Sequence, residues 1–339
     1  MKLPKNFNIK GNKSCVLVAP LDWGLGHATR CIPVIKELLS LNYTVLIGAS
    51  KSTEVLLKNE FPQLTFLPID GYNITYSKTK VGLWIKLITQ LPKIARCIKK
   101  EKKWLQQIIE QYNIELIISD NRPGLYSKQI KSIYLTHQLT IKANFSFIER
   151  QLQKLHYKFI NKFTECWVPD YEGENNLAGD LSHPKIEPTI PVKYINPLTR
   201  FIRKEMPVIY DAAIILSGPE PQRTIFENII LAQLKNTTKN IILVRGLPQH
   251  KSILNCSQPN VVIYNFLATD ELNRVMLQSS LIISRSGYST IMDLVVLEKK
   301  AVLVPTPGQT EQEYLAKLLE KKEHFIFINQ HEFNLQKIL

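Results

Sequence analysis

Short apolar runs alternate with amphipathic stretches along almost the whole chain. The apolar runs have the length of strands, and several of the stretches between them carry apolar residues at helical spacing. This alternation indicates parallel sheets with helices on both faces. Strands are predicted at 16–19, 43–48, 114–119, 132–136, 166–168, 212–217, 241–245, 261–264, 281–284 and 301–304, and helices at 28–40 and 51–60.

The pattern breaks between Pro191 and Pro207, where three prolines fall in a stretch with little periodicity. We place a linker near 198–208. A chain of 339 residues also exceeds the usual size of one hydrophobic core. The predicted fold is therefore α/β, with two Rossmann-like doubly wound parallel-sheet domains that face a cleft. They span residues 1–200 and 209–339, and ligands are expected at the carboxyl ends of their strands.

Composition places the chain among ordinary globular proteins, at 45% apolar and 21% charged residues. Residues 1–14 are polar and lack the apolar core of a signal peptide. No window approaches the roughly 18–20 apolar residues of a membrane-spanning helix. Five cysteines are scattered without CxxC spacing, which favours reduced thiols. These features predict a cytoplasmic protein.

The net charge of +14 is concentrated in the first part of the chain. Residues 1–200 hold 28 Lys and Arg against 16 Asp and Glu, whereas residues 201–339 hold 15 against 13. Residues 78–104 alone hold nine Lys and Arg and a single acid, Glu101. Their apolar residues recur at helical spacing, with a kink or a new helix start expected at Pro92.

This basic segment supports two interpretations. It could lie on the anionic inner face of the cell membrane as a peripheral contact. Alternatively, its apolar stripe joins the domain core and its lysines are a solvated cover. We expect an anionic partner for the first domain, either a membrane surface or a phospholipid-linked substrate, and no nucleic acid.

Residues 281–312 carry the chemistry of a nucleotide-sugar site. A predicted strand ends in the Arg-Ser-Gly of residues 285–287, where an amphipathic helix begins. A helix N-terminus leaves backbone N–H groups that bind phosphate. Asp293, one and a half turns later, could hold ribose hydroxyls. The loop after the next strand brings Glu311 and Gln312, which suit a sugar.

Two further loops of the second domain offer weaker signals. Gly218 stands in a glycine loop after the strand at 212–217 and lets the backbone approach a ligand. Arg223 could reach a diphosphate with its planar fork. Phe266 and Leu267 could sit beside a nucleobase, although an apolar pair is more often part of a core.

The loop after the first strand holds Gly24, Gly26 and His27. Its glycines suggest a dinucleotide site, but Thr29 occupies the third glycine position. The second strand ends in residues 48–50, Gly-Ala-Ser, with no carboxylate for an adenosine ribose. The glycine turn instead brings His27 to a helix start. There it could act as a general base or simply bond its own loop.

Three more polar residues follow strands of the first domain. Asp120 ends the strand at 114–119 and could orient His27 and stabilise its protonated form. An aspartate before a Pro-Gly turn is equally ordinary turn chemistry. His137 and Gln138 end the strand at 132–136, where an acceptor contact and a structural role are both open.

The sequence contains no DxD pair and no cluster of His, Cys and Asp at metal-ligand spacing. Arginine and helix N-termini must then stabilise a diphosphate leaving group. We predict neither a metal nor a cofactor, with the nucleotide sugar as co-substrate.

Together, these motifs resemble the two-domain glycosyltransferases of the GT-B fold. The resemblance is strongest over 281–316 and is closest to family 28, which includes the enzyme that adds N-acetylglucosamine to the lipid-linked peptidoglycan precursor. It implies a UDP-sugar bound by the second domain, an acceptor bound by the first, inversion at the anomeric carbon and no metal. Asp293 stands where the family has a ribose-binding glutamate. His27 matches the first-loop histidine, and its pairing with Asp120 resembles the His–Asp pair of UDP-sugar transferases that act on small molecules.

The residues and the resemblance assign His27 and Asp120 to catalysis. The acceptor set is Asp22, Trp23, His137 and Gln138. The donor set is Gly26, Gly218, Arg223, Phe266, Leu267, Arg285, Ser286, Gly287, Ser289, Thr290, Asp293, Gln309, Glu311 and Gln312.

Some motifs depart from the peptidoglycan enzyme. Its second glycine loop is Gly-Gly-Ser, whereas residues 217–219 are Ser-Gly-Pro. Its acceptor-side His-Glu-Gln-Asn appears only as the His-Gln-Leu-Thr of residues 137–140, and Leu315 replaces the usual Asn. These departures argue against that enzyme and leave the acceptor open.

The sequence therefore predicts an inverting, metal-independent hexosyltransferase. It would move a sugar from a UDP-sugar, with UDP-N-acetylglucosamine as a candidate, to an envelope glycan or a lipid-linked acceptor. One alternative is a UDP-sugar 2-epimerase of the same fold, which should need carboxylates beyond Asp22 and Asp120. A non-catalytic nucleotide-sugar-binding protein is the other.

Overall fold

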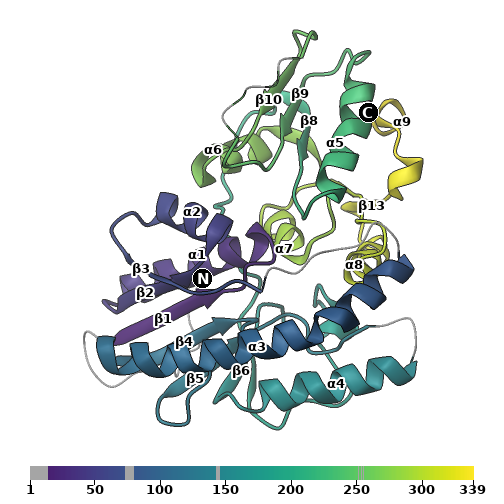
Figure 1. Ribbon diagram of the computed structural model, residues 1–339. Helices are drawn as coiled ribbons and strands as arrows, with labels where there is room; N and C mark the ends of the chain where they lie inside the picture. The colour runs from purple at the N-terminus through teal and green to yellow at the C-terminus, as the bar shows by residue number, and fades with distance from the viewer. Residues whose placement is uncertain (1–13, 73–79, 143–145, 251, 253, 255) are drawn as a thin grey trace. The chain divides into compact units, whose positions relative to one another are not determined.

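The computed structural model describes residues 14–72, 80–142, 146–250, 252, 254 and 256–339. The chain divides into two compact units (Figure 1). Unit 1 consists of Met1–Ile74 and Leu87–Leu198, and unit 2 of Thr75–Lys86 and Thr199–Leu339. The second boundary between the units falls at the start of the stretch predicted as a linker.

Unit 1 is built on a seven-stranded sheet in the order β3-β2-β1-β4-β5-β6-β7, with every neighbouring pair parallel. Chain order runs outward from β1 to β3, then restarts beside β1 with β4. This reversal is the switch point at which doubly wound sheets bind ligands. The strands are β1 (Cys15–Pro20), β2 (Thr44–Ala49), β3 (Thr65–Pro68), β4 (Ile114–Asp120), β5 (Lys131–Leu135), β6 (Glu165–Val168) and β7 (Val192–Tyr194).

Helices cover both faces of this sheet, with α1 and α2 on one side and α3 and α4 on the other (Figure 1). Side chains of α3 such as Leu105 and Ile108 pack against Leu17 and Ile117 of the central strands. Because both faces are covered, the central strands carry continuous apolar runs, at 16–19 in β1 and 116–118 in β4, rather than alternating ones. The helices are α1 (Leu25–Ser40), α2 (Lys51–Glu60), α3 (Lys80–Tyr112), α4 (Ser146–Ile160) and the 3₁₀ turn η1 (Gly179–Leu181).

Unit 2 repeats this topology with six parallel strands in the order β10-β9-β8-β11-β12-β13. Its switch point lies between β8 and β11. The strands are β8 (Tyr210–Ile215), β9 (Ile241–Val244), β10 (Val261–Tyr264), β11 (Ser279–Ser284), β12 (Ala301–Leu303) and β13 (Phe325–Phe327). The helices are α5 (Gln222–Leu234), α6 (Thr269–Leu277), α7 (Tyr288–Val296), α8 (Thr310–Leu319) and α9 (Leu335–Ile338), with the 3₁₀ turn η2 (Gln330–Glu332).

The core of unit 2 joins the first helix to the end of the chain. Phe226 of α5 packs edge-on against Phe333, with ring centroids 5.2 Å apart. Gln233 fastens the same contact, since its amide donates to the Phe333 carbonyl at 3.1 Å and accepts from the Leu335 N–H at 2.6 Å. The segment around Phe333 and Leu335 thus packs into the core of unit 2.

The predicted fold class is confirmed, because both sheets are parallel and doubly wound. All ten predicted strands occur, with ends shifted by at most two residues. The strands β3, β7 and β13 were not predicted, and β7 lies inside the proline-rich break. The helix α3 runs through Pro92, so no new helix starts there. Of the basic segment 78–104, residues 78 and 79 and the side chains of 80–89 lie outside the described part of the chain. No helix among the described residues is long and apolar enough to cross a membrane.

Candidate functional site

Sheet register brings three loops of unit 1 to one edge. Pro20 at the end of β1 pairs with Asp120 at the end of β4, which in turn pairs with Leu135 of β5. The loops after β1 and β5 therefore flank Asp120 at the carboxyl edge. This is the switch point of the sheet, and it brings together the strand ends and the helix start at which the sequence placed Asp120, His137 and His27.

Gly24 makes the turn from β1 into α1. Its φ of 90° lies in the left-handed region that glycine adopts without strain, and it precedes the first residue of the helix. His27 and Arg30 are three residues apart on this helix, so their side chains share one face. That face meets Asp120.

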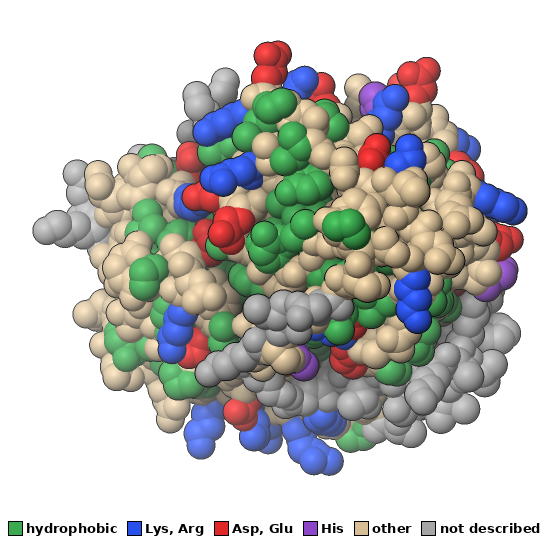
Figure 2. Space-filling model, turned by 90° about the horizontal axis from the view of Figure 1, so that it is seen from above, with side chains coloured by type: hydrophobic (Ala, Val, Ile, Leu, Met, Phe, Trp, Pro, Cys, Tyr) green, Lys and Arg blue, Asp and Glu red, His purple; other side chains and the backbone are tan. Residues whose placement is uncertain are grey.

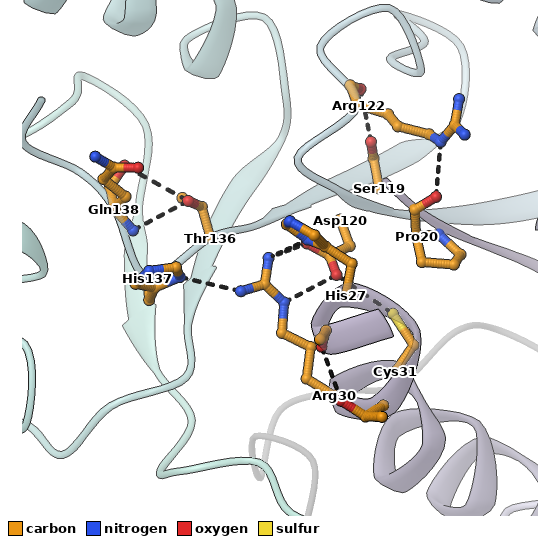
Figure 3. A network of polar contacts seen from close by, with 12 residues as sticks. Pro20, His27, Arg30, Cys31, Ser119, Asp120, Arg122, Thr136, His137 and Gln138 are labelled. Atoms are coloured by element: carbon orange, nitrogen blue, oxygen red, sulfur yellow. Dashed lines mark hydrogen bonds and ion pairs between the residues drawn. The ribbon is translucent and has the colours of Figure 1, made fainter. Parts of the chain in front are cut away.

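The side chains that meet at this edge form a buried cluster (Figure 3). His27 Nδ1 lies 3.1 Å from Asp120 Oδ1, as the proposed pairing requires. Arg30, which the sequence reasoning missed, donates from Nε to Asp120 Oδ2 at 2.9 Å and from Nη2 to Oδ1. Arg30 Nη2 also lies 2.8 Å from His27 Nδ1, and Nη1 lies 3.0 Å from His137 Nδ1. Cys31 points its thiol at Asp120 Oδ2, 3.6 Å away.

Charge in the cluster is balanced locally. Burial alone would raise the pKa of Asp120, but Arg30 and His27 outweigh it and hold this pKa below its usual range. Burial lowers the pKa of His27, and although Asp120 opposes the shift, Arg30 adds to it. At neutral pH the cluster therefore holds an ionised Asp120 and a neutral His27. Arg30 had a signal in the sequence, as a cation on the same helical face as His27.

The loop that carries His137 is held from two sides. Leu181 of η1 accepts the N–H groups of Leu139 and Thr140 through its carbonyl, at 2.6 and 2.9 Å. His156 Nε2 of α4 lies 2.8 Å from the carbonyl oxygen of Gln138. These contacts fix the backbone around His137 and Gln138, and His137 itself is 6% exposed.

Asp22 and Trp23 follow β1 directly. Asp22 accepts the N–H of Tyr72 at 3.1 Å, and a Cβ added to Gly71 would lie 2.2 Å from its carboxylate. Asp22 therefore fastens the stretch after β3 to the first loop, and a side chain at position 71 would displace its carboxylate. Trp23 is 39% exposed. The predicted acceptor contacts of both residues stay predictions.

A second buried network, also missed from the sequence, supports this loop. Arg122 is fully buried and donates from Nε to the Pro20 carbonyl at 2.8 Å and from Nη1 to Glu101 Oε1 at 2.8 Å. Tyr72 donates its hydroxyl to Glu101 Oε2 at 2.7 Å. Burial raises the pKa of Glu101 despite these partners. Glu101 was visible in the sequence as the single acid among nine cations. In the structure it forms an ion pair with Arg122.

The carboxyl edge of unit 2 gathers the loops after β8 and β11. Ser284 of β11 pairs with Ile215 of β8 on one side and Leu303 of β12 on the other. Gly218 in the first loop has a φ of 106°, a conformation that favours glycine, and a Cβ there would meet nothing within 4 Å. The predicted donor residues 218, 285–287 and 309–312 thus belong to neighbouring loops of one edge.

Arg285 is 1% exposed and bonds to protein oxygens. Its Nη1 donates to the carbonyls of Val304 and Pro305 at 3.2 and 3.1 Å. Its Nη2 donates to the Gln222 carbonyl at 3.0 Å and to Gln330 Oε1 at 2.7 Å. Burial lowers the pKa of Arg285 to about 10, still well above neutrality. Arg285 therefore holds the edge together, and its predicted diphosphate contact stays a prediction.

Ser286 and Gly287 lead into α7. Ser286 is buried and donates its hydroxyl to the Gln312 carbonyl at 2.8 Å. Gln312 accepts the N–H of Thr306 at 2.9 Å and donates to Gln309 Oε1 at 2.6 Å. Gly287 caps the helix without a side chain, and a Cβ there would meet nothing within 4 Å. The hydrogen bond from Ser286 to Gln312 thus anchors the start of α7, while the space beside Gly287 stays open.

Asp293 lies on α7, six residues after Gly287. Its Oδ1 accepts the hydroxyl of Thr199, the first residue of the second part of unit 2, at 2.6 Å. Burial raises the pKa of Asp293 to about 7, against the opposing effects of Thr199 and Arg200. Asp293 is therefore partly protonated at neutral pH.

A network at the other side of the edge was missed. Arg223 pairs with Glu220 at 2.6 Å and with Glu227 at 3.1 Å. Arg245, at the end of β9, pairs with Glu227 through two nitrogens and donates to Asn265 Oδ1 at 2.8 Å. Arg245 had the same signal in the sequence as Asp120, because both are charged residues at the end of a predicted strand. Of the predicted nucleobase pair, Phe266 is half-buried and Leu267 is buried.

Two family models match the chain. Residues 215–339 match the glycosyltransferase family 28 C-terminal domain, and residues 20–150 match a model named glycosyl transferase family 1. The fold is that of GT-B glycosyltransferases, and the two matches support a family 28-like glycosyltransferase. More narrowly, the match to the family 28 C-terminal domain covers residues 215–339.

Individual relatives agree with this classification. A stretch of 98 residues is 34% identical to the UDP-N-acetylglucosamine–N-acetylmuramyl-(pentapeptide) pyrophosphoryl-undecaprenol N-acetylglucosamine transferase of Prochlorococcus marinus (strain NATL1A), covering 28% of this chain and 26% of that protein. The chain thus spans about a quarter of the length of such relatives. An uncharacterized glycosyltransferase of Methanosarcina acetivorans is 22% identical over 330 residues, 88% of this chain and 81% of that one.

Solved structures share the fold at low sequence identity. The glycotransferase of kitacinnamycin superposes with a TM-score of 0.65 and 14% identity, covering 97% of this chain and 89% of that chain. MurG of Acinetobacter baumannii gives a TM-score of 0.54 and 14% identity, covering 96% of this chain and 88% of that chain.

Proposed function

We propose that this protein is an inverting, metal-independent glycosyltransferase that moves a sugar from a UDP-sugar to an acceptor bound by unit 1. The observation that carries the proposal is the His27–Asp120 contact at the switch point of the first sheet. Histidine is the commonest general base, and an ionised aspartate at Nδ1 turns the other ring nitrogen toward a substrate proton.

In the proposed reaction, the acceptor oxygen attacks the anomeric carbon of the donor sugar. The bond from that carbon to the β-phosphate oxygen breaks, and its electron pair leaves with UDP. His27 Nε2 takes the acceptor proton, and Asp120 steadies the imidazolium that results. Because the nucleophile attacks opposite the leaving group, the anomeric configuration inverts.

Unit 2 would hold the donor. The backbone at Ser286-Gly287 and the start of α7 favour a diphosphate, and Arg223 adds a guanidinium in the first turn of α5. Asp293 would accept ribose hydroxyls, and Gln309, Glu311 and Gln312 would bind the sugar. In this arrangement Arg285 supports the diphosphate site through the loops that it holds together.

We further propose UDP-N-acetylglucosamine as the donor and an envelope glycan or lipid-linked sugar as the acceptor. Support comes from the activity named for the Prochlorococcus relative and from the basic charge of residues 1–200. Figure 2 shows Lys and Arg side chains on several parts of one face, with acidic and hydrophobic side chains among them. A peripheral contact with the inner face of the cell membrane, in the cytoplasm, follows from the same charge. Removing the Lys residues of 78–104 should then weaken binding to anionic liposomes, and unchanged binding would disprove the membrane contact.

The function is tested by a turnover screen across UDP-, GDP- and TDP-sugars with lipid-linked and soluble glycan acceptors. We expect release of UDP coupled to glycoside formation, lost in His27→Ala and kept in His331→Ala, whose side chain is 78% exposed. Tight nucleotide-sugar binding without turnover in the wild type would disprove transfer and favour a binding protein. Conversion of UDP-N-acetylglucosamine to its epimer without an acceptor would favour the 2-epimerase.

A further inference from the structure

Arg30 contacts three ionisable side chains of the unit 1 cluster, those of Asp120, His27 and His137 (Figure 3). Its fork holds both oxygens of Asp120, with Nε 2.9 Å from Oδ2 and Nη2 bonded to Oδ1. The same Nη2 lies 2.8 Å from His27 Nδ1, and Nη1 lies 3.0 Å from His137 Nδ1. Arg30 is 2% exposed, so these contacts are shielded from water.

The two polar partners of His27 Nδ1 require opposite protonation of that nitrogen. A guanidinium only donates and a carboxylate only accepts. His27 Nδ1 has one of each within reach, with Arg30 Nη2 at 2.8 Å and Asp120 Oδ1 at 3.1 Å. A proton on Nδ1 can bond Asp120 but then faces Arg30. A lone pair on Nδ1 can bond Arg30 but then faces Asp120. The two partners therefore select opposite tautomers of His27.

We infer that Arg30 is a positioning residue that competes with Asp120 for His27 and makes His27 a weaker proton acceptor than an isolated His–Asp pair. In such a pair the carboxylate stabilises the imidazolium. Here the same carboxylate is already neutralised by a two-pronged arginine contact, and a positive charge stands beside the ring. Both effects disfavour a second proton on His27.

The groups around His27 come from three elements. Arg30 and Cys31 lie on α1, Asp120 ends β4, and His137 follows β5. Burial lowers the pKa of His27 most, Asp120 opposes this shift, and Arg30 and His137 add to it. A general base must be unprotonated before it acts. The arginine thus extends the pH range of the active form downward, at the cost of a weaker base.

This inference rests on the proposed function only for its effect on rate, because the titration of His27 needs neither donor nor acceptor. We would titrate the seven histidines by ¹⁵N NMR and assign His27 from the signals lost in His27→Gln. The wild-type ring should titrate below the ordinary value of about 6.5. Arg30→Met should raise the pKa of His27 by about 1 unit or more, and Arg30→Lys, which keeps the charge without the fork, by less.

The matched control is Arg203→Met, because Arg203 is 58% exposed and pairs with Glu298 in unit 2. It should leave the pKa of His27 unchanged. A wild-type His27 that titrates at or above about 6.5 overturns the inference, as does a folded Arg30→Met protein whose His27 titrates as in the wild type. If Arg30→Met does not fold, the wild-type titration and Arg30→Lys decide.

The pH profile of kcat/KM then separates the two proposals. The acid limb should move to higher pH in Arg30→Met together with the pKa of His27. If the pKa of His27 rises and the limb stays in place, the arginine inference stands and His27 is not the base of the proposed reaction.

Discussion

The two sheets share one strand order, yet their carboxyl edges use charge differently. In unit 1 the ionisable groups touch one another, and Arg30, Asp120 and His27 form a cluster around one carboxylate. In unit 2 the touching ionisable groups are the arginines and glutamates of the Arg223–Glu227–Arg245 network, with no histidine among them. Arg285 bonds to carbonyls and an amide, and the edge presents the start of a helix. Proton transfer needs titratable groups in contact, whereas a diphosphate needs a fixed positive end of a dipole. We therefore propose that one topology serves acid–base chemistry in unit 1 and anion binding in unit 2.

The largest change in stability is expected at the centre of the unit 1 cluster. Asp120→Asn removes the carboxylate charge to which Arg30 Nε and Nη2 bond. The buried guanidinium of Arg30 then lacks its counter-charge. The free energy of unfolding should fall by about 3–5 kcal/mol, measured by urea denaturation. As control, Glu298→Gln breaks the exposed pair with Arg203 and should cost less than about 1 kcal/mol. Equal losses in both variants would mean that the buried cluster contributes no more than a surface ion pair.

In unit 2 the corresponding test is Arg285→Met. This change keeps much of the apolar stem but leaves the carbonyls of Val304, Pro305 and Gln222 without their donor. We expect a loss of about 2–4 kcal/mol in the free energy of unfolding. Arg203→Met on the surface should lose little. If Arg285→Met keeps its stability but loses UDP affinity, Arg285 binds the diphosphate directly and the contrast between the two edges is weaker.

Asp293 should give unit 2 a pH dependence of its own. Its pKa is raised to about 7 in the folded protein, above the ordinary value of 3.8. Its protonated form is therefore favoured by folding, and the stability it contributes is present at low pH and lost as the pH rises toward 7. Between pH 5 and pH 8 the wild type should lose about 2–3 kcal/mol that Asp293→Asn keeps. Parallel curves of melting temperature against pH for the two proteins would contradict this.

The smallest effect is expected at a glycine turn. Gly218 has a φ of 106°, so an alanine there is strained although its Cβ would meet no neighbour. Gly218→Ala should cost about 1–2 kcal/mol of stability. Gly287→Ala is the matched control, because Gly287 has a φ of −70° and equal room, and it should be nearly neutral in stability. Equal costs at both positions would show that backbone strain is not what fixes Gly218.

The sequence predicts the architecture well because the strands are apolar runs that are buried on both faces. It misses β3, β7 and β13, which lie at the edges of the sheets and are partly exposed. The equally short β6, β9 and β12 are fully buried, and their apolar runs predict them. The break in the pattern at 191–207 correctly precedes unit 2, but it hides β7. Strand pairing also depends on distant residues, so a short edge strand has no local signature.

The candidate site is only half visible in the sequence. His27 and Asp120 are predictable, because each follows a strand that the pattern predicts. Arg30 and Glu227 are much harder to predict. Arg30 shares a helical face with His27, but a charged residue inside a helix is normally solvated. Burying them depends on partners about 90 residues and 18 residues away. The predicted roles of the donor residues stay predictions, while the structure shows which loops bring them together.

The most direct test of the division between the two units separates binding from turnover. UDP affinity is measured by calorimetry and sugar transfer by product formation, in His27→Ala and Asp293→Ala. His27→Ala should bind UDP like the wild type and transfer sugar about 10²- to 10⁴-fold more slowly. Asp293→Ala should bind UDP about 10- to 100-fold more weakly. A His27→Ala protein that loses UDP affinity, beside an Asp293→Ala protein that keeps it, would contradict the account.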